Sequence, residues 1–399
     1  MVQGGSTLKR VAFCMQANPN NWLGGLSYFR NLFTAICAND GRRIEPVLLA
    51  YPELHQNNLI GFPDIEVIRS PLVAPRHPLR LAGRLFFDVV NRDLSLEALL
   101  RKHRLDAMSH STVTGRSSKT ASISWIPDFQ HIRMPQYFNQ SEIQERNKQF
   151  RRLANESHRI IVSSNDALRD FAAFAPDAVD KARVLQFVSC PGVGSQILPL
   201  DQLNKFYGVD RPYFHLPNQF WTHKNHAVVI EALSILKKRD INVLVLATGN
   251  TLDHRDPLHF GRLTERAKQL GVDDRFRTLG IVPLPVLHSL MRNAIALINP
   301  SNFEGWSTTV EESKSLGLPI VLSDIPVHIE QAPPFGRYFK AGSAEDLAEA
   351  LEKSLQEIDP LMKKRALQMA AVELPGRIKQ FGRAYDEIAM AAIADAQPS

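Results

Sequence analysis

The stretch from residue 294 to residue 324 constrains the fold of this chain more than any other. Its apolar run, Ala294–Ile298, predicts a strand buried on both faces of a parallel sheet. A short loop, a helix that Gly317 ends, and a second apolar run, Ile320–Leu322, follow. This order predicts a strand–loop–helix–strand unit, in which ligands bind where the first strand ends and the helix begins.

The loop and the start of the helix carry the polar groups of this crevice. Thr308 or Thr309 is expected to cap the helix, because each has a glutamate three residues on. The backbone N–H groups of Gly305–Thr309 would then point into the crevice, where a helix N-terminus favours an anion. Glu304 in the loop and Glu312, expected in the first turn, would repel a bare phosphate but accept hydrogen bonds from hydroxyl groups. A nucleotide sugar combines hydroxyl groups with a diphosphate.

In its context, PSxxEGW…EExxxxGxPIVxSD, the Glu304-x7-Glu312 pair resembles the signature of retaining glycosyltransferases of the GT-B fold, especially family 4. The resemblance implies that Glu304 contacts the hydroxyl groups of the donor sugar and that Glu312 holds the ribose. Acidic residues at an ordinary exposed helix start are the alternative interpretation. Trp306 stands where the family usually has Phe. The resemblance also places the residues between the two glutamates in the donor site: Gly305, Trp306, Ser307 and Thr308.

Two glycines follow the first predicted strand. Arg10–Gln16 reads as that strand and Leu26–Ala38 has helical periodicity, with Gly24 and Gly25 at the end of the loop between them. Glycines let the backbone approach a phosphate closely. The resemblance implies that Gly24 and Gly25 lie against the donor diphosphate; a plain flexible loop is the alternative.

A third predicted strand leads to the acceptor side. Ala121–Asp128 reads as a buried strand that runs into a loop. In the family the matching strand commonly ends in His-Asp. Here Asp128 fits the aspartate, Pro127 stands at the histidine position, and His131 is the candidate for the missing imidazole. A loop that caps a following helix is the alternative interpretation.

The second half of the chain repeats the strand–loop–helix plan. In this loop the family has an arginine and a lysine that neutralise the diphosphate. Lys224 matches the lysine, but Gln219 stands at the arginine position, where it can form a hydrogen bond without offsetting charge. Arg133 and Lys314 are the candidate replacements. Gly249, at the end of the next strand, resembles the family's glycine-containing turn and joins the expected donor site.

The sequence predicts an enzyme that needs no metal or other cofactor. The chain contains no Asp-x-Asp, the pattern with which other glycosyltransferases bind a metal. His223 and His226 form a His-x2-His pair, but no cysteine or acidic residue stands at ligand spacing beside it. We therefore expect this pair to cap the next helix.

Composition sets the broad class. A length of 399 residues suffices for two domains, and 44% hydrophobic with 22% charged residues is typical of a soluble globular protein. No apolar run reaches the length of a membrane span, the N-terminus lacks a secretory signal, and three cysteines lack close pairing, which together predict a cytoplasmic protein. The net charge of +6 permits an anionic partner without demanding one.

An arginine-rich region, residues 76–104, contains apolar positions spaced for an amphipathic helix. Two interpretations remain open for it. The first is a packed helix with solvated arginines. The second is peripheral contact with the anionic inner face of a membrane.

These patterns predict an α/β protein of GT-B fold, with two doubly wound Rossmann-like domains facing a cleft. Residues 1–200 would bind the acceptor, residues 201–375 the nucleotide sugar, and a helix over residues 376–399 would cross back to the first domain. The resemblance implies retaining transfer of a sugar from a UDP-, GDP- or dTDP-sugar to a saccharide or lipid-linked saccharide, in surface polysaccharide or lipopolysaccharide assembly. No nucleic-acid partner is expected. The alternatives are a non-catalytic nucleotide-sugar-binding protein, which Gln219 and Pro127 favour, and a GT-B phosphorylase or epimerase.

Overall fold

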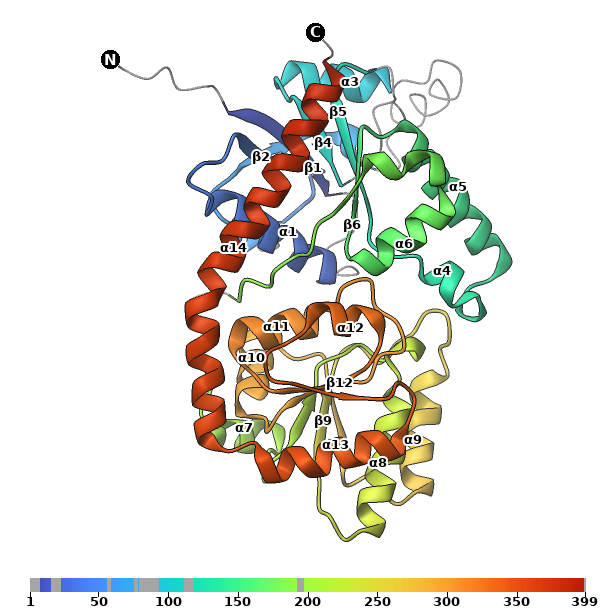
Figure 1. The fold of residues 1–399 in the computed structure, drawn as a ribbon, viewed down its shortest axis with the longest axis vertical. Coiled ribbons are helices and arrows are strands. Elements are labelled where there is room, and N and C mark those ends of the chain that lie inside the picture. The colour runs from blue at the N-terminus through green and yellow to red at the C-terminus, as the bar shows by residue number, and fades with distance from the viewer. Residues whose placement is uncertain are drawn as a thin grey trace. The chain divides into compact units, whose positions relative to one another are not determined.

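The computed structural model describes residues 8–15, 23–55, 59–74, 78, 93–110, 118–191 and 197–397. The chain divides into two compact units (Figure 1). Unit 1 comprises Met1–Pro135, Asn139–Cys190 and Pro375–Ser399, and unit 2 comprises Gln136–Phe138 and Pro191–Leu374.

Unit 1 is built on a parallel sheet. Among the described residues the sheet has seven strands in the order β3-β2-β1-β4-β5-β6-β7, so the strand order reverses between β1 and β4. The strands are β1 Lys9–Met15, β2 Ile44–Ala50, β3 Glu66–Arg69, β4 Ala107–Ser109, β5 Ala121–Ile126, β6 Arg159–Val162 and β7 Ala182–Val184. The helices are α1 Leu23–Cys37, α3 Leu94–Lys102, α4 Gln130–Arg133, α5 Gln140–Glu156 and α6 Asn165–Phe174.

Unit 2 repeats this plan. Its described residues form a parallel six-stranded sheet in the order β10-β9-β8-β11-β12-β13, which reverses between β8 and β11. The strands are β8 Phe214–Leu216, β9 Val245–Thr248, β10 Phe276–Gly280, β11 Leu297–Asn299, β12 Ile320–Ser323 and β13 Gly336–Phe339. The helices are α7 Leu200–Tyr207, α8 His226–Lys238, α9 His259–Gln269, α10 Leu284–Asn293, α11 Thr308–Leu316, α12 Pro326–Gln331 and α13 Ala344–Glu357. The predicted fold of two doubly wound α/β domains is confirmed.

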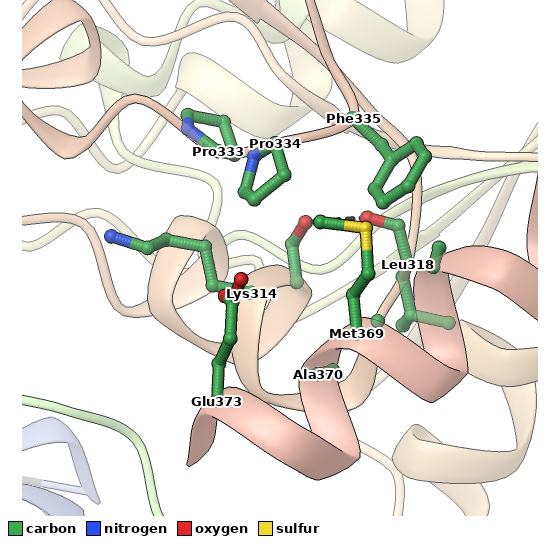
Figure 2. A pocket seen from close by; sticks show the side chains of 11 residues that line it. Lys314, Leu318, Pro333, Pro334, Phe335, Met369, Ala370 and Glu373 are labelled. Carbon is green, nitrogen blue, oxygen red and sulfur yellow. Dashed lines mark hydrogen bonds between the residues drawn. The ribbon is translucent and has the colours of Figure 1, made fainter. Parts of the chain in front are cut away.

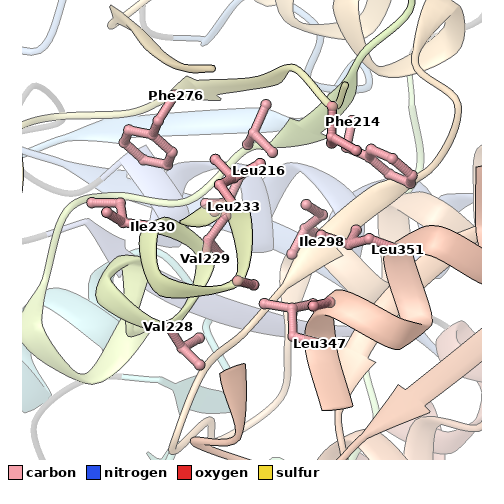
Figure 3. Close-up of a cluster of buried hydrophobic side chains, with 14 of the residues drawn as sticks. Phe214, Leu216, Val228, Val229, Ile230, Leu233, Phe276, Ile298, Leu347 and Leu351 are labelled. Carbon is pink, nitrogen blue, oxygen red and sulfur yellow. The ribbon is translucent and has the colours of Figure 1, made fainter. Parts of the chain in front are cut away.

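One part of the core of unit 2 lies between its sheet and helices α8 and α13 (Figure 3). Val229 and Leu233 on α8, and Leu347 and Leu351 on α13, are fully buried, because a spacing of four residues places each pair on one helix face. They share one cluster with Ile298 of β11. Burial of each such side chain contributes about 1.5–3 kcal/mol. The core therefore fixes the strands from whose ends the site loops leave.

Helix α14, Pro360–Ala396, contributes to both units. The sequence predicts a helix over residues 376–399, directly after Pro375, whereas α14 begins at Pro360 and contains Pro375 in its interior. Proline is a common first residue of a helix, which explains the prediction, but an interior proline costs one hydrogen bond that packing can offset. In unit 1, Asp386 of α14 pairs with Arg43 at 2.7 Å.

The first half of α14 packs closely on the end of α11 in unit 2. Gly317 ends α11 with a φ of 63°, and a Cβ there would lie 2.4 Å from the carbonyl oxygen of Ala366. This contact explains why the helix stops at a glycine. A small pocket opens beside it, lined among others by Lys314, Met369 and Glu373 (Figure 2). The pocket lies at the C-terminal end of α11, away from the loop that carries Glu304.

None of the helices that the structure describes combines the length and the apolar composition needed to span a membrane. Of the arginine-rich region, residues 75–77 and 79–92 lie outside the described residues, and so does the amphipathic helix expected there. Residues Leu94–Lys102 form α3.

Candidate functional site

Two loops of unit 2 meet where the strand order of its sheet reverses. One loop, residues 217–225, follows β8, and the other, residues 300–307, follows the neighbouring strand β11. The backbone N–H of Asn302 donates to the carbonyl of His223 at 2.8 Å, which ties the loops together. In open α/β sheets this reversal is where ligands bind.

An ion pair joins the two loops. Lys224 Nζ lies 2.6 Å from Glu304 Oε1, and only 14% and 9% of the respective side chains are exposed. Burial alone would raise the pKa of Glu304, but the charge of Lys224 outweighs it and holds that pKa below its usual value. The Glu304 carboxylate is therefore ionised. The predicted sugar-binding carboxylate and the predicted phosphate-binding lysine lie in direct contact, although 80 residues separate them.

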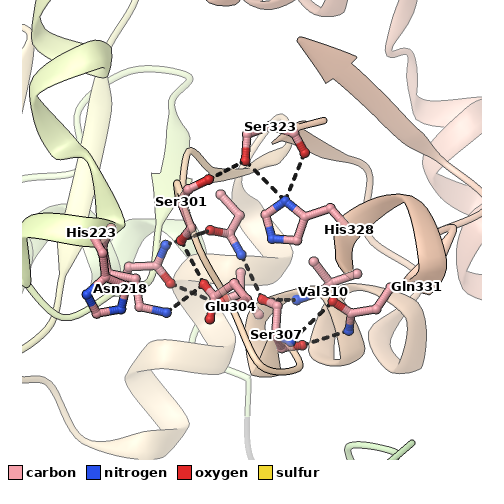
Figure 4. Close-up of polar contacts among 12 residues, drawn as sticks. Asn218, His223, Ser301, Glu304, Ser307, Val310, Ser323, His328 and Gln331 are labelled. Atoms are coloured by element: carbon pink, nitrogen blue, oxygen red, sulfur yellow. Dashed lines mark hydrogen bonds and ion pairs between the residues drawn. The ribbon is translucent and has the colours of Figure 1, made fainter. Parts of the chain in front are cut away.

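A chain of hydrogen bonds from β12 and α12 supports the Glu304 carboxylate (Figure 4). Ser301 Oγ donates to Glu304 Oε1 at 2.7 Å, and Ser323 Oγ donates to the Ser301 carbonyl at 2.6 Å. His328 Nδ1 lies 2.9 Å from the Ser323 carbonyl, which can only accept, so Nδ1 carries the hydrogen. Burial lowers the pKa of His328 to about 4, so the imidazole is neutral at pH 7. Lys224 and this chain of hydrogen bonds thus hold the same carboxylate oxygen, Glu304 Oε1.

The start of α11 differs from the prediction. The cap is Ser307, whose Oγ accepts from the Val310 N–H at 3.4 Å, and neither Thr308 nor Thr309 caps the helix. Thr309 Oγ1 donates instead to Asn218 Oδ1 at 3.0 Å. The helix begins one residue earlier than expected because the hydroxyl of Ser307, fixed by its neighbours, already serves as cap.

A glutamine from α12 clamps the capping residue. Gln331 accepts from the Ser307 N–H at 3.2 Å and donates to the Ser307 carbonyl at 3.0 Å (Figure 4). The expectation that every N–H group of Gly305–Thr309 faces a ligand is therefore wrong for Ser307. Of the other predicted donor residues in this stretch, Gly305 and Thr308 are partly exposed and Trp306 is buried.

The two neighbouring glutamates of α11 have different surroundings. Glu312 is partly exposed and stands in the second turn of α11. The prediction had placed it in the first turn. Glu311 occupies the first turn, is 1% exposed, and accepts from Gln331 Nε2 at 3.1 Å. It also pairs with Lys314 at 3.3 Å.

Both cations expected to replace the missing arginine pair with carboxylates of their own unit. Lys314 pairs with Glu311 and donates to the Gln331 carbonyl at 2.7 Å. Arg133 lies in unit 1, where it pairs with Asp170 at 2.7 Å and with Asp166 at 3.1 Å. Gln219, at the arginine position, is partly exposed on the loop after β8.

Of the predicted glycines, Gly249 is a close-packing position. Gly249 follows β9 with a φ of 148°, and a Cβ there would lie 2.4 Å from the carbonyl oxygen of Asn218. This close approach requires glycine and holds the loop after β8 against β9. Gly24 and Gly25 lie in the first turn of α1, not in the loop before it, because the helix begins at Leu23. Residues 16–22 of that loop lie outside the described residues.

Asp128 and His131, the two candidates for the acceptor site, both contact other residues of unit 1. Asp128 Oδ1 accepts from the Gln130 N–H at 2.9 Å, at the start of α4, whose capping residue Phe129 forms no side-chain capping bond. His131 is 1% exposed, lies 3.1 Å from Asn147 Oδ1, and packs edge-on against Phe150. Helix α4 turns this imidazole into the core of unit 1, so the prediction that it replaces the missing histidine of the strand end is not supported.

The histidine pair does not cap the following helix. The capping residue of α8 is Asn225, which has a φ of 53° and forms no side-chain capping bond. His226 is buried and stacks on Phe220 with ring centres 4.1 Å apart. His223 is 5% exposed and lies 3.4 Å from an Arg255 nitrogen. Among the described residues there is no group of three or more His, Cys, Asp or Glu side chains that could hold a metal ion.

The strand-order reversal of unit 1 brings together residues that sequence reasoning missed. Tyr28 OH lies 2.8 Å from His110 Nε2, and His110 directly follows β4. The Tyr28 ring stacks on Trp125 of β5 with centres 4.4 Å apart and planes inclined by 9°. The available signal was weak, because β4 contains only three residues.

Comparison with known proteins extends these observations. Residues 206–369 match the family model Glycosyl transferases group 1. No curated protein matches the sequence. Among solved structures, HepE from Anabaena in complex with UDP and glucose has a TM-score of 0.67 at 15% identity, with coverage of 95% of this chain and 98% of that one.

Two further solved structures have the same fold. A glycosyltransferase from Rickettsia africae ESF-5 has a TM-score of 0.67 at 14% identity, covering 96% of this chain and 98% of that one. WaaG, a glycosyltransferase involved in lipopolysaccharide biosynthesis, has a TM-score of 0.57 at 16% identity, covering 98% of this chain and 100% of that one. The match over residues 206–369 and the shared fold support a glycosyltransferase enzyme built on the GT-B fold.

Proposed function

We propose that this chain transfers a sugar from a nucleotide-diphosphate sugar to a saccharide or lipid-linked saccharide, with retention of the anomeric configuration. The observation that carries the proposal is the Lys224–Glu304 pair at the strand-order reversal of unit 2. A cation and a carboxylate held side by side suit a ligand that presents a diphosphate next to sugar hydroxyl groups.

The residues around the pair would each contact a different part of the donor. Glu304 would accept hydrogen bonds from the sugar hydroxyls, and Lys224 would neutralise part of the diphosphate. The partly exposed Glu312 would hold the ribose. The N-terminus of α11 adds the positive end of a helix dipole. The sugar-side and phosphate-side groups are thus adjacent, as they are in the donor.

The reaction would exchange two bonds at the anomeric carbon. The bond from this carbon to the leaving phosphate oxygen breaks, and the acceptor oxygen bonds to it on the same face. The acceptor proton passes to the leaving phosphate, so no protein nucleophile is needed. Lys224 would stabilise the charge that develops on the departing diphosphate, since preorganised electrostatic stabilisation is usually the largest catalytic term.

Three further features of the proposal concern partners. WaaG, similar in fold, acts in lipopolysaccharide biosynthesis, and HepE binds UDP, which favours UDP-sugars as donors and surface polysaccharide or lipopolysaccharide assembly as the process. Unit 1 would bind the acceptor. Transfer would need no metal ion, because the sequence has no Asp-x-Asp to hold one.

A thermal-shift panel tests donor binding. Wild type, Glu312→Ala and a matched control on the surface of α13, Glu349→Ala, are melted with UDP, GDP, dTDP and their sugar conjugates in the presence of EDTA. A ligand at 100 times its Kd adds about 2.7 kcal/mol of stability. We expect one nucleotide to raise the Tm of wild type and of Glu349→Ala, and to raise that of Glu312→Ala much less. Equal shifts in all three proteins would remove Glu312 from the site.

Gln219 favours a second candidate function, the binding of nucleotide sugars without turnover. The reason is that Gln219 supplies no charge where the family has arginine. The panel alone does not separate binding from turnover. Release of the nucleoside diphosphate from its sugar conjugate does, since a binding protein would give a thermal shift without release.

A further inference from the structure

The proposed diphosphate site lacks one positive charge at Gln219, and the loop after β9 brings a cation against the loop that carries Gln219 and Lys224. This loop is joined to the loop after β8 at two points. The Phe220 N–H donates to the Asn250 carbonyl at 2.9 Å, and the Thr222 N–H donates to Asp253 Oδ2 at 3.1 Å. The cation is Arg255.

Asp253 fixes Arg255 relative to the loop that carries Lys224. The carboxylate is 1% exposed, and its Oδ1 accepts from the backbone N–H of Arg255 at 3.0 Å and from Arg255 Nε at 3.3 Å. Its Oδ2 accepts from Thr222. Burial alone would raise the pKa of Asp253, but the hydrogen bonds from Thr222 and Arg255 hold it below its usual value. One ionised carboxylate therefore orients both loops.

The guanidinium of Arg255 lies against His223, the residue next to Lys224. Arg255 Nη2 is 3.4 Å from His223 Nδ1, and 11% of the Arg255 side chain is exposed. Burial, with the charges of Lys224 and Arg255, lowers the pKa of His223 to about 3. The imidazole is therefore neutral, and two cations approach it from two different loops.

The charges around the ion pair show why a second cation matters. In the structure the charge of Lys224 is engaged by Glu304 at 2.6 Å. A nucleoside diphosphate brings more than one negative charge, so Lys224 alone leaves part of it uncompensated. Asp253 contacts the guanidinium at Nε, and the planar fork of an arginine suits a phosphate better than a lysine or a glutamine does.

We propose that Arg255 supplies the second positive charge of the diphosphate site, in place of the arginine that Gln219 replaces. The inference rests on the proposed function, because it assumes that a nucleotide diphosphate binds at the Lys224–Glu304 pair. It assigns the compensation to the loop after β9, instead of to Arg133 or Lys314.

Calorimetric titration of charged and uncharged ligands tests the role of Arg255. Wild type, Arg255→Gln, Arg255→Lys and a matched control, Arg266→Gln, are titrated with UDP and uridine, GDP and guanosine, and dTDP and thymidine. Arg266 lies on α9 of the same unit and pairs with Glu231 at the surface. We expect Arg255→Gln to weaken the diphosphate about tenfold to a hundredfold and to leave the nucleoside unchanged. Arg255→Lys should lose less, and Arg266→Gln nothing.

A rescue variant separates charge from structure. If Arg255 acts through its charge, Gln219→Arg in the Arg255→Gln background restores most of the lost affinity for the diphosphate. An equal loss for nucleoside and diphosphate without rescue, or no loss in Arg255→Gln and Arg255→Lys, overturns the proposal. A wild type that binds none of the three diphosphates overturns the proposed function itself, and the two failures are thereby distinguished.

Discussion

The strand-order reversals of the two units have the same backbone plan and opposite chemistry. In unit 2 the loops after β8 and β11 bring together Lys224 and Glu304, a largely buried ion pair with 2.6 Å between Nζ and Oε1. In unit 1 helix α1 and the end of β4 bring together Tyr28 and His110, which form a hydrogen bond of 2.8 Å. Burial lowers the pKa of His110 to about 3, so the pair in unit 1 is neutral.

Both reversals also contain a strained backbone position. His110 has a φ of 59° and Asn225, next to Lys224, a φ of 53°. Residues other than glycine seldom adopt this conformation, and such strain collects at functional sites. The fold thus sets where a ligand binds, and the side chains set its chemistry. A charged pair suits a diphosphate, and the stacked rings of Tyr28 and Trp125 suit an uncharged partner such as a saccharide, in line with the proposed division of donor and acceptor.

The largest expected effect breaks the charged pair. Lys224→Met leaves Glu304 buried without its cation, which should lower the free energy of unfolding of unit 2 by about 3–5 kcal/mol. Chemical denaturation measures this loss. The double variant Lys224→Met/Glu304→Gln should recover most of it, because no unpaired charge remains. A loss below about 1 kcal/mol in the single variant would mean that the pair is solvated and not a buried ion pair.

The second effect is a pH dependence of stability. It comes from His328, which belongs to the hydrogen-bond chain that supports Glu304. Burial lowers the pKa of His328 to about 4 in the folded state, against 6.5 for the ordinary value. Below pH 6.5 the unfolded chain binds a proton that the folded chain does not, so stability falls as the pH falls from about 6.5 towards 4. Between pH 7 and pH 5.5 this histidine should cost about 1 kcal/mol.

Denaturation of His328→Gln at the two pH values checks this cost. The stability difference between pH 7 and pH 5.5 should be smaller than that of wild type by about 1 kcal/mol, since glutamine does not titrate. Three other buried histidines of unit 2 have pKa values of about 3 and remain in the variant: His215, His223 and His226. An unchanged difference would show that His328 is protonated in the folded protein.

The smallest expected effect is in unit 1. Tyr28→Phe removes the hydrogen bond to His110 and keeps the stack on Trp125, so we expect a loss of about 0.5–1.5 kcal/mol in denaturation. The loss should not grow between pH 7 and pH 5.5, because His110 stays neutral over that range. A loss of stability as large as that of Lys224→Met would contradict the proposed difference between the charged pair of unit 2 and the neutral pair of unit 1.

The sequence predicted strands that form apolar runs, such as β11 and β12, and missed β4 and β13, which contain polar residues. Without a strand at β4 there was no predicted place for His110. The doubly wound fold followed from the repeated strand–loop–helix pattern, which needs no knowledge of side-chain contacts. Element boundaries depend on caps, and the cap at Ser307 is set by Gln331, a contact across 24 residues.

The sequence points to Glu304 and Lys224 as candidate site residues, but not to the contact between them. Glu304 and Lys224 stand out by motif, but their pairing depends on β8 and β11 being neighbours in the sheet. His131 was misplaced because a four-residue helix rotates it into the core. Arg255 carried no motif, since its place beside His223 depends on how Asp253 joins two loops.

Release of a nucleoside diphosphate from its sugar conjugate tests the central claim most directly. Wild type and Glu304→Gln are incubated with UDP-, GDP- and dTDP-sugars in the presence of EDTA, and the free diphosphate is measured with and without saccharide acceptors. The account predicts release by wild type from one donor, a rate at least about a hundredfold lower in Glu304→Gln, and no need for a metal. Thermal stabilisation by a nucleotide sugar without any release would contradict it and identify a binding protein instead.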